Sequence, residues 1–169
     1  MGMRQTLSSA GWAVRSRGRI VGSGFFIHPS ARVRVDPGVA LELGRGAHVS
    51  EGASLVIKAD TTIGRGVFIG RNATIVAFSS LSIGAGTLIA ENVSIHTENH
   101  RGRTLSEFTS APVSIGERCW LCAGVVVTRG AVIGDETVVG ANSVVTGSLV
   151  GGMVAAGAPA RVIRPRTDL

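Results

Sequence analysis

The sequence predicts an all-β fold, a parallel β-helix of hexapeptide repeats with one extended loop, and two observations carry this prediction. The first is an aliphatic side chain at every sixth position of the C-terminal half: Ile115, Leu121, Val127, Ile133, Val139 and Val145. The second is a small or branched residue four places after each of the first five, namely Cys119, Val125, Ala131, Thr137 and Ser143. A six-residue period matches neither an α-helix nor a single long strand. Short straight segments that are joined by turns and stacked into a coil satisfy it.

The same period runs through the N-terminal half, with shifts of phase. The residues that keep it are Ile27, Val33 and Val39, then Leu43, Val49 and Leu55, then Ile57, Ile63, Ile69, Ile75 and Leu81, and finally Ile83, Ile89 and Ile95. Each shift indicates a corner that has gained or lost residues, and the glycines that often follow the aliphatic residue suit such corners. Three hexads would close a triangular turn of about 18 residues, and roughly seven turns, each rising about 4.8 Å, would form the column.

The 169 residues fit one domain, which we divide into two parts. Residues 23–169 are assigned to the β-helix, with a loop at 96–112, and residues 1–22 to an N-terminal basic segment. That segment contains Arg4, Arg15, Arg17 and Arg19, and its first twenty residues include no acid. We expect it to cap the open end of the column, because an uncovered coil exposes unpaired strand edges. Contact with a membrane surface is the alternative.

Hydropathy indicates where the protein is located, and charge indicates which kinds of ligand it binds. No window is long and apolar enough to span a bilayer and no signal peptide is evident, so we expect a cytoplasmic protein. The net charge of +6 and the pI near 11.2 raise the question of nucleic-acid binding. The arginines are spread along the chain without aromatic stacking partners, so we expect no nucleic acid and favour an acidic small ligand or an anionic glycan.

The two cysteines form a C-x-x-C sequence, Cys119-Trp120-Leu121-Cys122. Such a pair can be redox-active or supply half of a zinc site. Here the repeat places Cys119 at the small inward position and Cys122 where other hexads have glycine. Because a second ligand pair with zinc spacing is missing, we predict a packing role and no metal.

The repeat stops between Ile95 and Val113, and the polar residues 96–112 include two of the four histidines, His96 and His100. A rigid column with one long polar excursion is typical of a scaffold that presents a functional loop. A tolerated insertion is the alternative, since a loop of this length costs little to close.

The segments that flank this loop resemble a known family. They are Thr97-Glu98-Asn99-His100, Pro112-Val113-Ser114-Ile115-Gly116 with Trp120, and the closing Val154-Ala155-Ala156-Gly157-Ala158-Pro159-Ala160-Arg161-Val162-Ile163-Arg164. Over residues 72–164 the chain resembles the hexapeptide-repeat acyltransferases, in particular the sugar O-acetyltransferases of the maltose and galactoside type and their polysaccharide-modifying relatives. The resemblance implies a left-handed β-helix, acetyl-CoA as the co-substrate, and a homotrimer whose sites lie between adjacent columns.

The resemblance also implies a catalytic role for His100, as the base that takes the proton of a sugar hydroxyl. An alcohol does not ionise near neutral pH, whereas an imidazole with a free pKa of about 6.5 can accept its proton. Such help is typically worth about 10² to 10⁴ in rate. His96 is the fallback for this role, and Glu98 and Asn99 are expected to contact the acceptor.

For coenzyme A, the residues that match the family's groove are Trp120, Ala123, Ala141, Thr146, Arg161 and Arg164. The guanidinium fork of arginine suits the nucleotide phosphates. The chain departs from the family's pattern at two positions. Gly147 replaces a common lysine that follows the Thr146 position, and Gly70 replaces an active-site asparagine.

Two other functions remain open at this point. One is a non-catalytic β-helix that serves as a scaffold or assembly subunit, which coenzyme A binding would exclude. The other is a γ-type carbonic anhydrase-like zinc protein, which needs three histidines around one metal ion. Within the acetyltransferase interpretation, the N-terminal region lacks the helical acceptor-binding segment of the simple disaccharide enzymes. We therefore expect action in surface-polysaccharide or glycoconjugate synthesis, with the acceptor and the acyl length unspecified.

Overall fold

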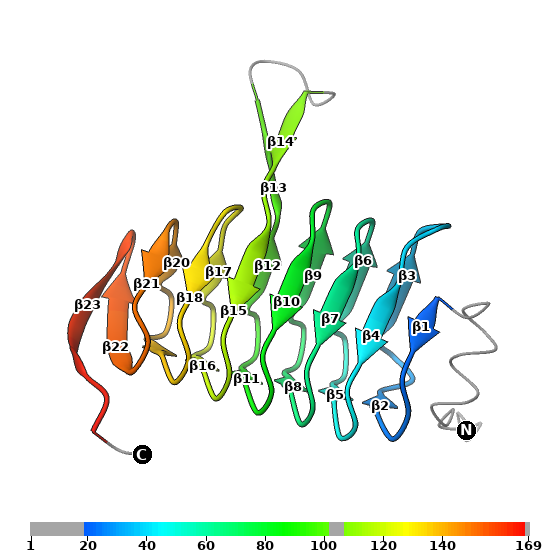
Figure 1. Ribbon diagram of the computed structural model, residues 1–169, viewed down its shortest axis with the longest axis horizontal. Helices are drawn as coiled ribbons and strands as arrows, with labels where there is room; N and C mark the ends of the chain where they lie inside the picture. Colours follow the sequence, from blue (N-terminus) through cyan, green and yellow to red (C-terminus); the bar gives the residue numbers. More distant parts are fainter. Residues whose placement is uncertain (1–18, 102–106, 168–169) are drawn as a thin grey trace.

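The computed structural model describes residues 19–101 and 107–167, which form a parallel β-helix of about seven coils (Figure 1). Three parallel sheets make the three faces of a triangular column, and a two-stranded antiparallel hairpin projects from it. The fold class predicted from the hexads is confirmed. None of the described residues belongs to a helix that is long and apolar enough to cross a membrane.

Each coil contributes one short strand to each face, except that the last coil has no strand on the third face. The first face contains β1 (Ile20–Val21), β4 (Leu41–Leu43), β7 (Thr61–Ile63), β10 (Leu81–Ile83), β15 (Val113–Ile115), β18 (Val132–Ile133) and β21 (Ser148–Leu149). The second contains β2 (Phe26–Ile27), β5 (His48–Val49), β8 (Phe68–Ile69), β11 (Leu88–Ile89), β16 (Trp120–Leu121), β19 (Val138–Val139), β22 (Met153–Gly157) and β23 (Ala160–Pro165). The third contains β3 (Arg32–Val35), β6 (Ser54–Ile57), β9 (Thr74–Ala77), β12 (Ser94–His96), β17 (Val126–Val127) and β20 (Val144–Val145).

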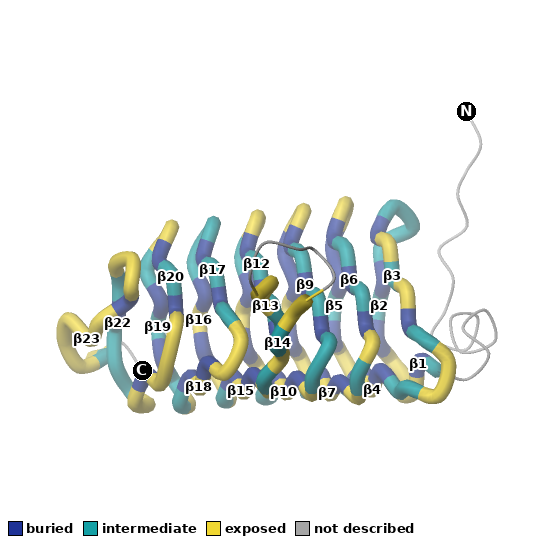
Figure 2. The backbone as a smooth tube through the Cα atoms, turned by 90° about the horizontal axis from the view of Figure 1, so that it is seen from above, coloured by how far each residue is buried: buried dark blue, intermediate teal, exposed yellow. Residues whose placement is uncertain are grey.

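The aliphatic residues of the hexads are buried and form the core of the column. Figure 2 shows that buried segments recur from coil to coil. Ile63, Ile83 and Ile115 are neighbours on the first face, each almost fully buried. The residue four places after the aliphatic one is buried as well, including Cys119 and the threonines Thr87 and Thr137. The core is narrow, and each hexad contributes one aliphatic side chain to it. This explains why the aliphatic residues recur every six positions rather than every two.

The coils are not all of the predicted length. Leu41 pairs with Thr61 and Thr61 with Leu81, so these coils contain 20 residues, whereas the step from Ser114 to Val132 contains the expected 18. The two extra residues lie in the four-residue strands of the third face and the corner that follows them, which explains the shifts of phase. The coil between Leu81 and Val113 contains 32 residues because it includes the hairpin.

The two ends of the column differ. Ile20 is buried and pairs with Leu41, so the column begins inside the segment 1–22 that the sequence assigned to a cap. Residues 1–18, with Arg4, Arg15 and Arg17, lie outside the described residues. At the other end β23 folds back antiparallel on β22 and exposes Arg161, Arg164 and Pro165, and these residues discourage further pairing along this edge.

Candidate functional site

The segment 96–112 is a β-hairpin rather than an irregular loop, as far as it is described. β13 (Glu98–His100) pairs with β14 (Phe108–Ser110), while residues 102–106 lie outside the described residues. The hairpin leaves the column between β12 of the third face and β15 of the first face. It therefore stands on the corner opposite the second face, as Figure 1 shows.

Thr97 fixes the root of the hairpin. Its hydroxyl oxygen accepts the backbone N–H of Phe78 at 2.7 Å and that of Ser79 at 2.9 Å, both on the preceding coil. Its own N–H donates to the carbonyl of Val76 and its carbonyl accepts the N–H of Ala111, where the hairpin returns. The residue is fully buried, at the inward position that Ile57 and Ala77 fill in the preceding coils.

Glu98 pairs with His96 across this root. Its Oε1 lies 3.2 Å from Nδ1 of His96, and its side chain is only 15% exposed. With the proton of a neutral imidazole held on Nδ1, the Nε2 atom of His96 becomes a hydrogen-bond acceptor. Asn99 is exposed and alternates with Glu98 along β13, so the two residues predicted to bind the acceptor lie on opposite sides of the hairpin.

His100 is exposed near the outer end of β13, directly opposite Phe108. The Phe108 ring meets the ring of Phe78 edge-on, with centroids 5.0 Å apart, and Nζ of Lys58 lies 4.4 Å from the centre of the Phe78 ring. The residue paired with the predicted base thus contacts a second aromatic ring, and an ammonium group lies over that second ring. Sequence reasoning missed these partners, because residues 58, 78 and 108 come together only through the stacking of coils.

The residues predicted to bind coenzyme A lie mostly on the other side of the column. Trp120 projects from the second face and is 44% exposed, in register with Leu88 and Val138. Arg161 and Arg164 lie on β23 at the end of the same sheet. Ala123 and Ala141 occupy neighbouring corners between the second and third faces, where the N–H of Asn142 donates to the Ala123 carbonyl. Only Thr146, which follows β20, is on the corner that bears the hairpin.

The two departures from the family's pattern have different structural settings. A Cβ on Gly70 would come within 2.6 Å of the Ala90 backbone, so this corner packs too closely on the next coil for any side chain. A Cβ on Gly147 would meet nothing within 4 Å, and a side chain there is sterically free.

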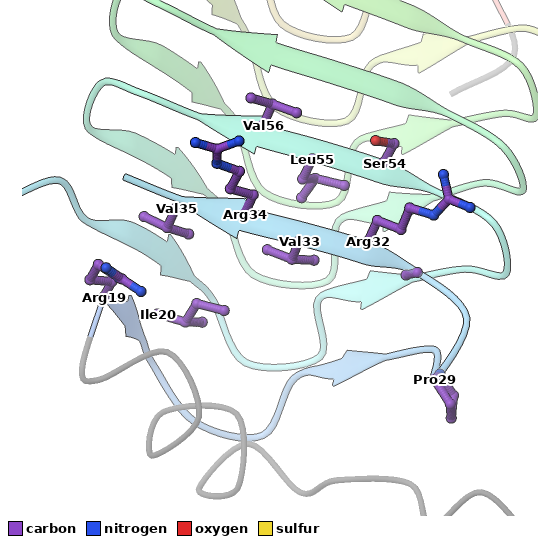
Figure 3. Close-up of a pocket in the computed structure, with 11 residues that line it drawn as sticks. Arg19, Ile20, Pro29, Arg32, Val33, Arg34, Val35, Ser54, Leu55 and Val56 are labelled. Atoms are coloured by element: carbon purple, nitrogen blue, oxygen red, sulfur yellow. The ribbon is translucent and has the colours of Figure 1, made fainter. Parts of the chain in front are cut away.

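A cavity lies away from these residues. A hollow of about 580 Å³ opens at the N-terminal end of the column between the first two coils (Figure 3). Arg19, Arg32 and Arg34 surround an apolar floor that includes Val33 and Leu55. None of the residues predicted for the site lines it, so we attribute it to the end of the column and not to the chemistry.

The remaining histidines lie on the first coils. The ring of His48 is stacked between Phe26 and Phe68, with centroids 4.8 and 5.1 Å apart, and burial together with nearby His28 lowers the pKa of His48. His28 bonds Ser30. These two imidazoles therefore do not converge with His96 and His100, and the described residues contain no cluster of three potential metal ligands.

The cysteines are free thiols with different exposure. Cys119 is buried, its sulfur lies 3.2 Å from the Gly134 carbonyl, and burial raises the pKa of its thiol. Cys122 is partly exposed, and burial raises its pKa as well. A raised pKa suppresses the reactive thiolate, which agrees with the packing role predicted for the pair.

Comparisons with known proteins match two stretches of the chain to family models of hexapeptide repeats. The family model described as bacterial transferase hexapeptide (six repeats) matches residues 112–147, and that described as hexapeptide repeat of succinyl-transferase matches residues 60–96. Over these two stretches the chain is therefore similar to the hexapeptide-repeat transferases.

Two curated relatives match part of the chain. Galactoside O-acetyltransferase of Escherichia coli (strain K12) is 42% identical over 76 residues, which are 45% of this chain and 37% of that protein. WcaF of the same organism, which is assigned to colanic acid biosynthesis as an acetyltransferase, is 51% identical over 59 residues, or 35% of this chain and 32% of that protein. The chain spans about a third of the length of these relatives.

Solved structures share the whole column. AntD, an N-acyltransferase from Bacillus cereus in complex with dTDP and 3-hydroxybutyryl-CoA, has a TM-score of 0.85 over 98% of this chain and 92% of its own, at 19% identity. A maltose O-acetyltransferase from Clostridium difficile 630 has a TM-score of 0.64 over 92% of this chain and 75% of its own, at 25% identity. At 19% identity, the similarity to AntD shows a common fold.

Proposed function

We propose that this protein is an acetyl-CoA-dependent O-acetyltransferase that modifies a sugar hydroxyl during the synthesis of a surface polysaccharide or glycoconjugate. The acetyltransferases that match its repeats support the reaction class, and WcaF supports the kind of acceptor. The observation that carries the proposal is the hairpin, which holds His100 clear of an otherwise regular column and begins next to a second imidazole, that of His96 at the end of β12.

His100 is the general base in this proposal. The acceptor oxygen forms a bond to the acetyl carbon while the bond from that carbon to sulfur breaks. The imidazole takes the hydroxyl proton and passes it to the departing thiolate of coenzyme A. The exposure of His100 leaves room for an acceptor beside it.

His96 is the second candidate for the base, because only this imidazole is paired with a carboxylate in the described residues. The Glu98 pair would orient Nε2 of His96 toward the acceptor, as a third group orients the base in other transfer enzymes. The segment Thr97-Glu98-Asn99-His100, which resembles the family's T-x-x-H sequence, favours His100. An experiment therefore has to decide which of the two histidines is the base.

The active site in this proposal lies between copies of the chain, in a homotrimer. The hairpin and Trp120 are at similar heights, since Trp120 pairs with Leu88 of the coil that carries β12. They nevertheless lie on opposite sides of one column, so the base of one copy can meet coenzyme A only on a neighbouring copy. Trp120, Ala123, Ala141, Arg161 and Arg164 would hold the coenzyme there. Such head-to-tail contacts close into a ring of three copies when each copy is rotated by a third of a turn from the one before it.

The test measures release of coenzyme A from acetyl-CoA over a panel of sugars and sugar nucleotides, with chromatography to keep protein thiols from contributing. We expect acceptor-dependent release that falls by about 10² to 10⁴ in His100→Ala and far less in His96→Ala. The opposite order would assign the base to His96. Absence of both release and calorimetric coenzyme A binding would refute the proposed function and favour a scaffold.

A further inference from the structure

The surface beside His100 has a composition that suits a ligand. His100 and Phe108 are directly paired in the hairpin, so their side chains project from the same side of it. Phe108 is 48% exposed, although a large apolar ring on a projecting hairpin gains nothing from contact with water. The exposed ring and the imidazole therefore project from the same side of the hairpin.

This surface continues onto the column. Phe78, which meets Phe108 edge-on, follows β9, and Lys58, whose ammonium lies over the Phe78 ring, follows β6 on the preceding coil. The backbone N–H of Lys58 donates to the Ala77 carbonyl, which keeps the two corners in contact. An imidazole, two aromatic rings and an ammonium group thus follow one another along a single corner.

The aromatic rings and the ammonium group can each contact a different part of an anionic sugar. The face of an aromatic ring carries partial negative charge and attracts the weakly positive C–H groups of a pyranose ring. The ammonium of Lys58 attracts a phosphate or a carboxylate as a point charge. Lys58 is exposed, and the ion pairs found among the described residues do not include it.

We propose that Phe108, Phe78 and Lys58 form the acceptor platform, and that it takes a sugar that bears a phosphate or a carboxylate. The sugar ring packs on the aromatic pair, its anionic group contacts Lys58, and a hydroxyl is presented to His100. This inference rests on the proposed function for its catalytic consequence, but the binding itself can be tested separately.

The kinetic test compares glucose 1-phosphate, glucuronic acid and glucose as acceptors. We expect the wild type to prefer the two anionic sugars, and Lys58→Gln to raise KM for them roughly tenfold while KM for glucose and for acetyl-CoA stays unchanged. Arg65→Gln is the matched control, because Arg65 is an exposed cation on the corner between the first and second faces. Equal effects of the two substitutions would overturn the role of Lys58.

Aromatic stacking is tested by two substitutions at one position. Phe108→Leu keeps an apolar side chain without a ring and should raise KM for all three sugars roughly tenfold, whereas Phe108→Tyr should restore it. A Phe108→Leu enzyme with wild-type KM, or a Tyr variant no better than Leu, would show that the ring only packs the hairpin.

A binding measurement tests the acceptor platform independently of acetyl transfer. Saturation-transfer NMR with glucose 1-phosphate and no coenzyme A should show binding to the wild type that Lys58→Gln and Phe108→Leu each weaken. If the wild type transfers no acetyl group yet shows this pattern, the proposed function fails and the platform stands. If glucose 1-phosphate binds equally to all three proteins or to none, the platform is refuted.

Discussion

The hydroxyl oxygen of Thr97 lies 2.7 Å from the backbone nitrogen of Phe78, so a fully buried side chain on one coil holds the corner of the coil before it. The same threonine accepts a second N–H, that of Ser79, and its carbonyl receives the returning strand of the hairpin at Ala111. Because Thr97 stands between His96 and Glu98, this one residue sets the direction in which the hairpin leaves the column.

Replacing Thr97 with valine should impair catalysis more than it impairs folding. The substitution keeps the shape but leaves two partly buried N–H groups without an acceptor. An unpaired group that is buried costs about 1 to 3 kcal/mol. A misplaced hairpin should lower kcat by up to about 10²-fold and leave KM for acetyl-CoA unchanged. Thr97→Ser should restore kcat, as steady-state kinetics would show.

Thr87 provides the matched control for this change. It is also fully buried, and its hydroxyl accepts the N–H of Cys119 and donates to the Gly116 carbonyl, away from the hairpin. Thr87→Val should therefore show a similar loss of denaturation midpoint with a nearly normal kcat. Equal losses of kcat in the two valine variants would mean that Thr97 has no special role in placing the hairpin.

Introducing a lysine at residue 147 should strengthen coenzyme A binding. The position has open space around it, and the family resemblance described for the sequence implies a lysine there. If the ammonium reaches a phosphate of the coenzyme, Gly147→Lys should lower KM for acetyl-CoA several-fold, with stability within about 0.5 kcal/mol of the wild type. Gly147→Gln is the uncharged control, and equal effects of lysine and glutamine would argue against a phosphate contact.

Gly70 should tolerate no side chain at all. An added Cβ would lie 2.6 Å from the carbonyl carbon of Ala90 and 2.8 Å from the nitrogen of Glu91, both backbone atoms that cannot move independently. Overpacking of this kind costs typically about 1 to 3 kcal/mol. Gly70→Ala should lower the chemical denaturation midpoint accordingly, and Gly147→Ala should leave it nearly unchanged. Wild-type stability of the Gly70 variant would show that the coils can separate at this corner.

The two thiols should react slowly and in a fixed order. Burial raises the pKa of both Cys119 and Cys122, so each has less thiolate near pH 8 than an ordinary cysteine. Mass spectrometry after iodoacetamide treatment should show Cys122 modified first and Cys119 only on unfolding. Because the unfolded thiols ionise first, stability is fully present below their ordinary pKa and falls as the pH rises above it. Rapid modification of Cys119 in the native protein at pH 8 would contradict its placement in the core.

The sequence was sufficient to predict the architecture, because a period of six is a local pattern that each rung repeats independently. The lengths of the coils were predicted less well, since a 20-residue coil preserves the hexads on two faces and adds its extra residues at one corner. The partners of the hairpin were not predictable at all. Phe78 and Phe108 are 30 positions apart in the sequence, and only the stacking of coils brings them together.

The residues predicted for the site lie on two different sides of the column, and their spacing in the sequence could not indicate this. His100 and Thr146 belong to one corner, and Trp120 with Arg161 and Arg164 belongs to the opposite face. Nor did the sequence distinguish which histidine Glu98 would meet. The bend at Thr97 turns Glu98 toward His96, two residues away, and this choice depends on the hydrogen bonds that hold the bend.

Coexpression of two differently inactivated chains tests the central claim most directly, that the hairpin of one copy acts on acetyl-CoA held by the next. One chain would carry His100→Ala and the other Arg161→Ala with Arg164→Ala, and acetyl transfer would be measured for each alone and for purified mixed oligomers. Each variant alone should have little activity, and the mixed oligomers should recover a substantial fraction of the wild-type rate, because some interfaces combine an intact hairpin with an intact coenzyme site. Mixed oligomers as inactive as the separate variants, or a monomer that turns over at the wild-type rate, would contradict the account.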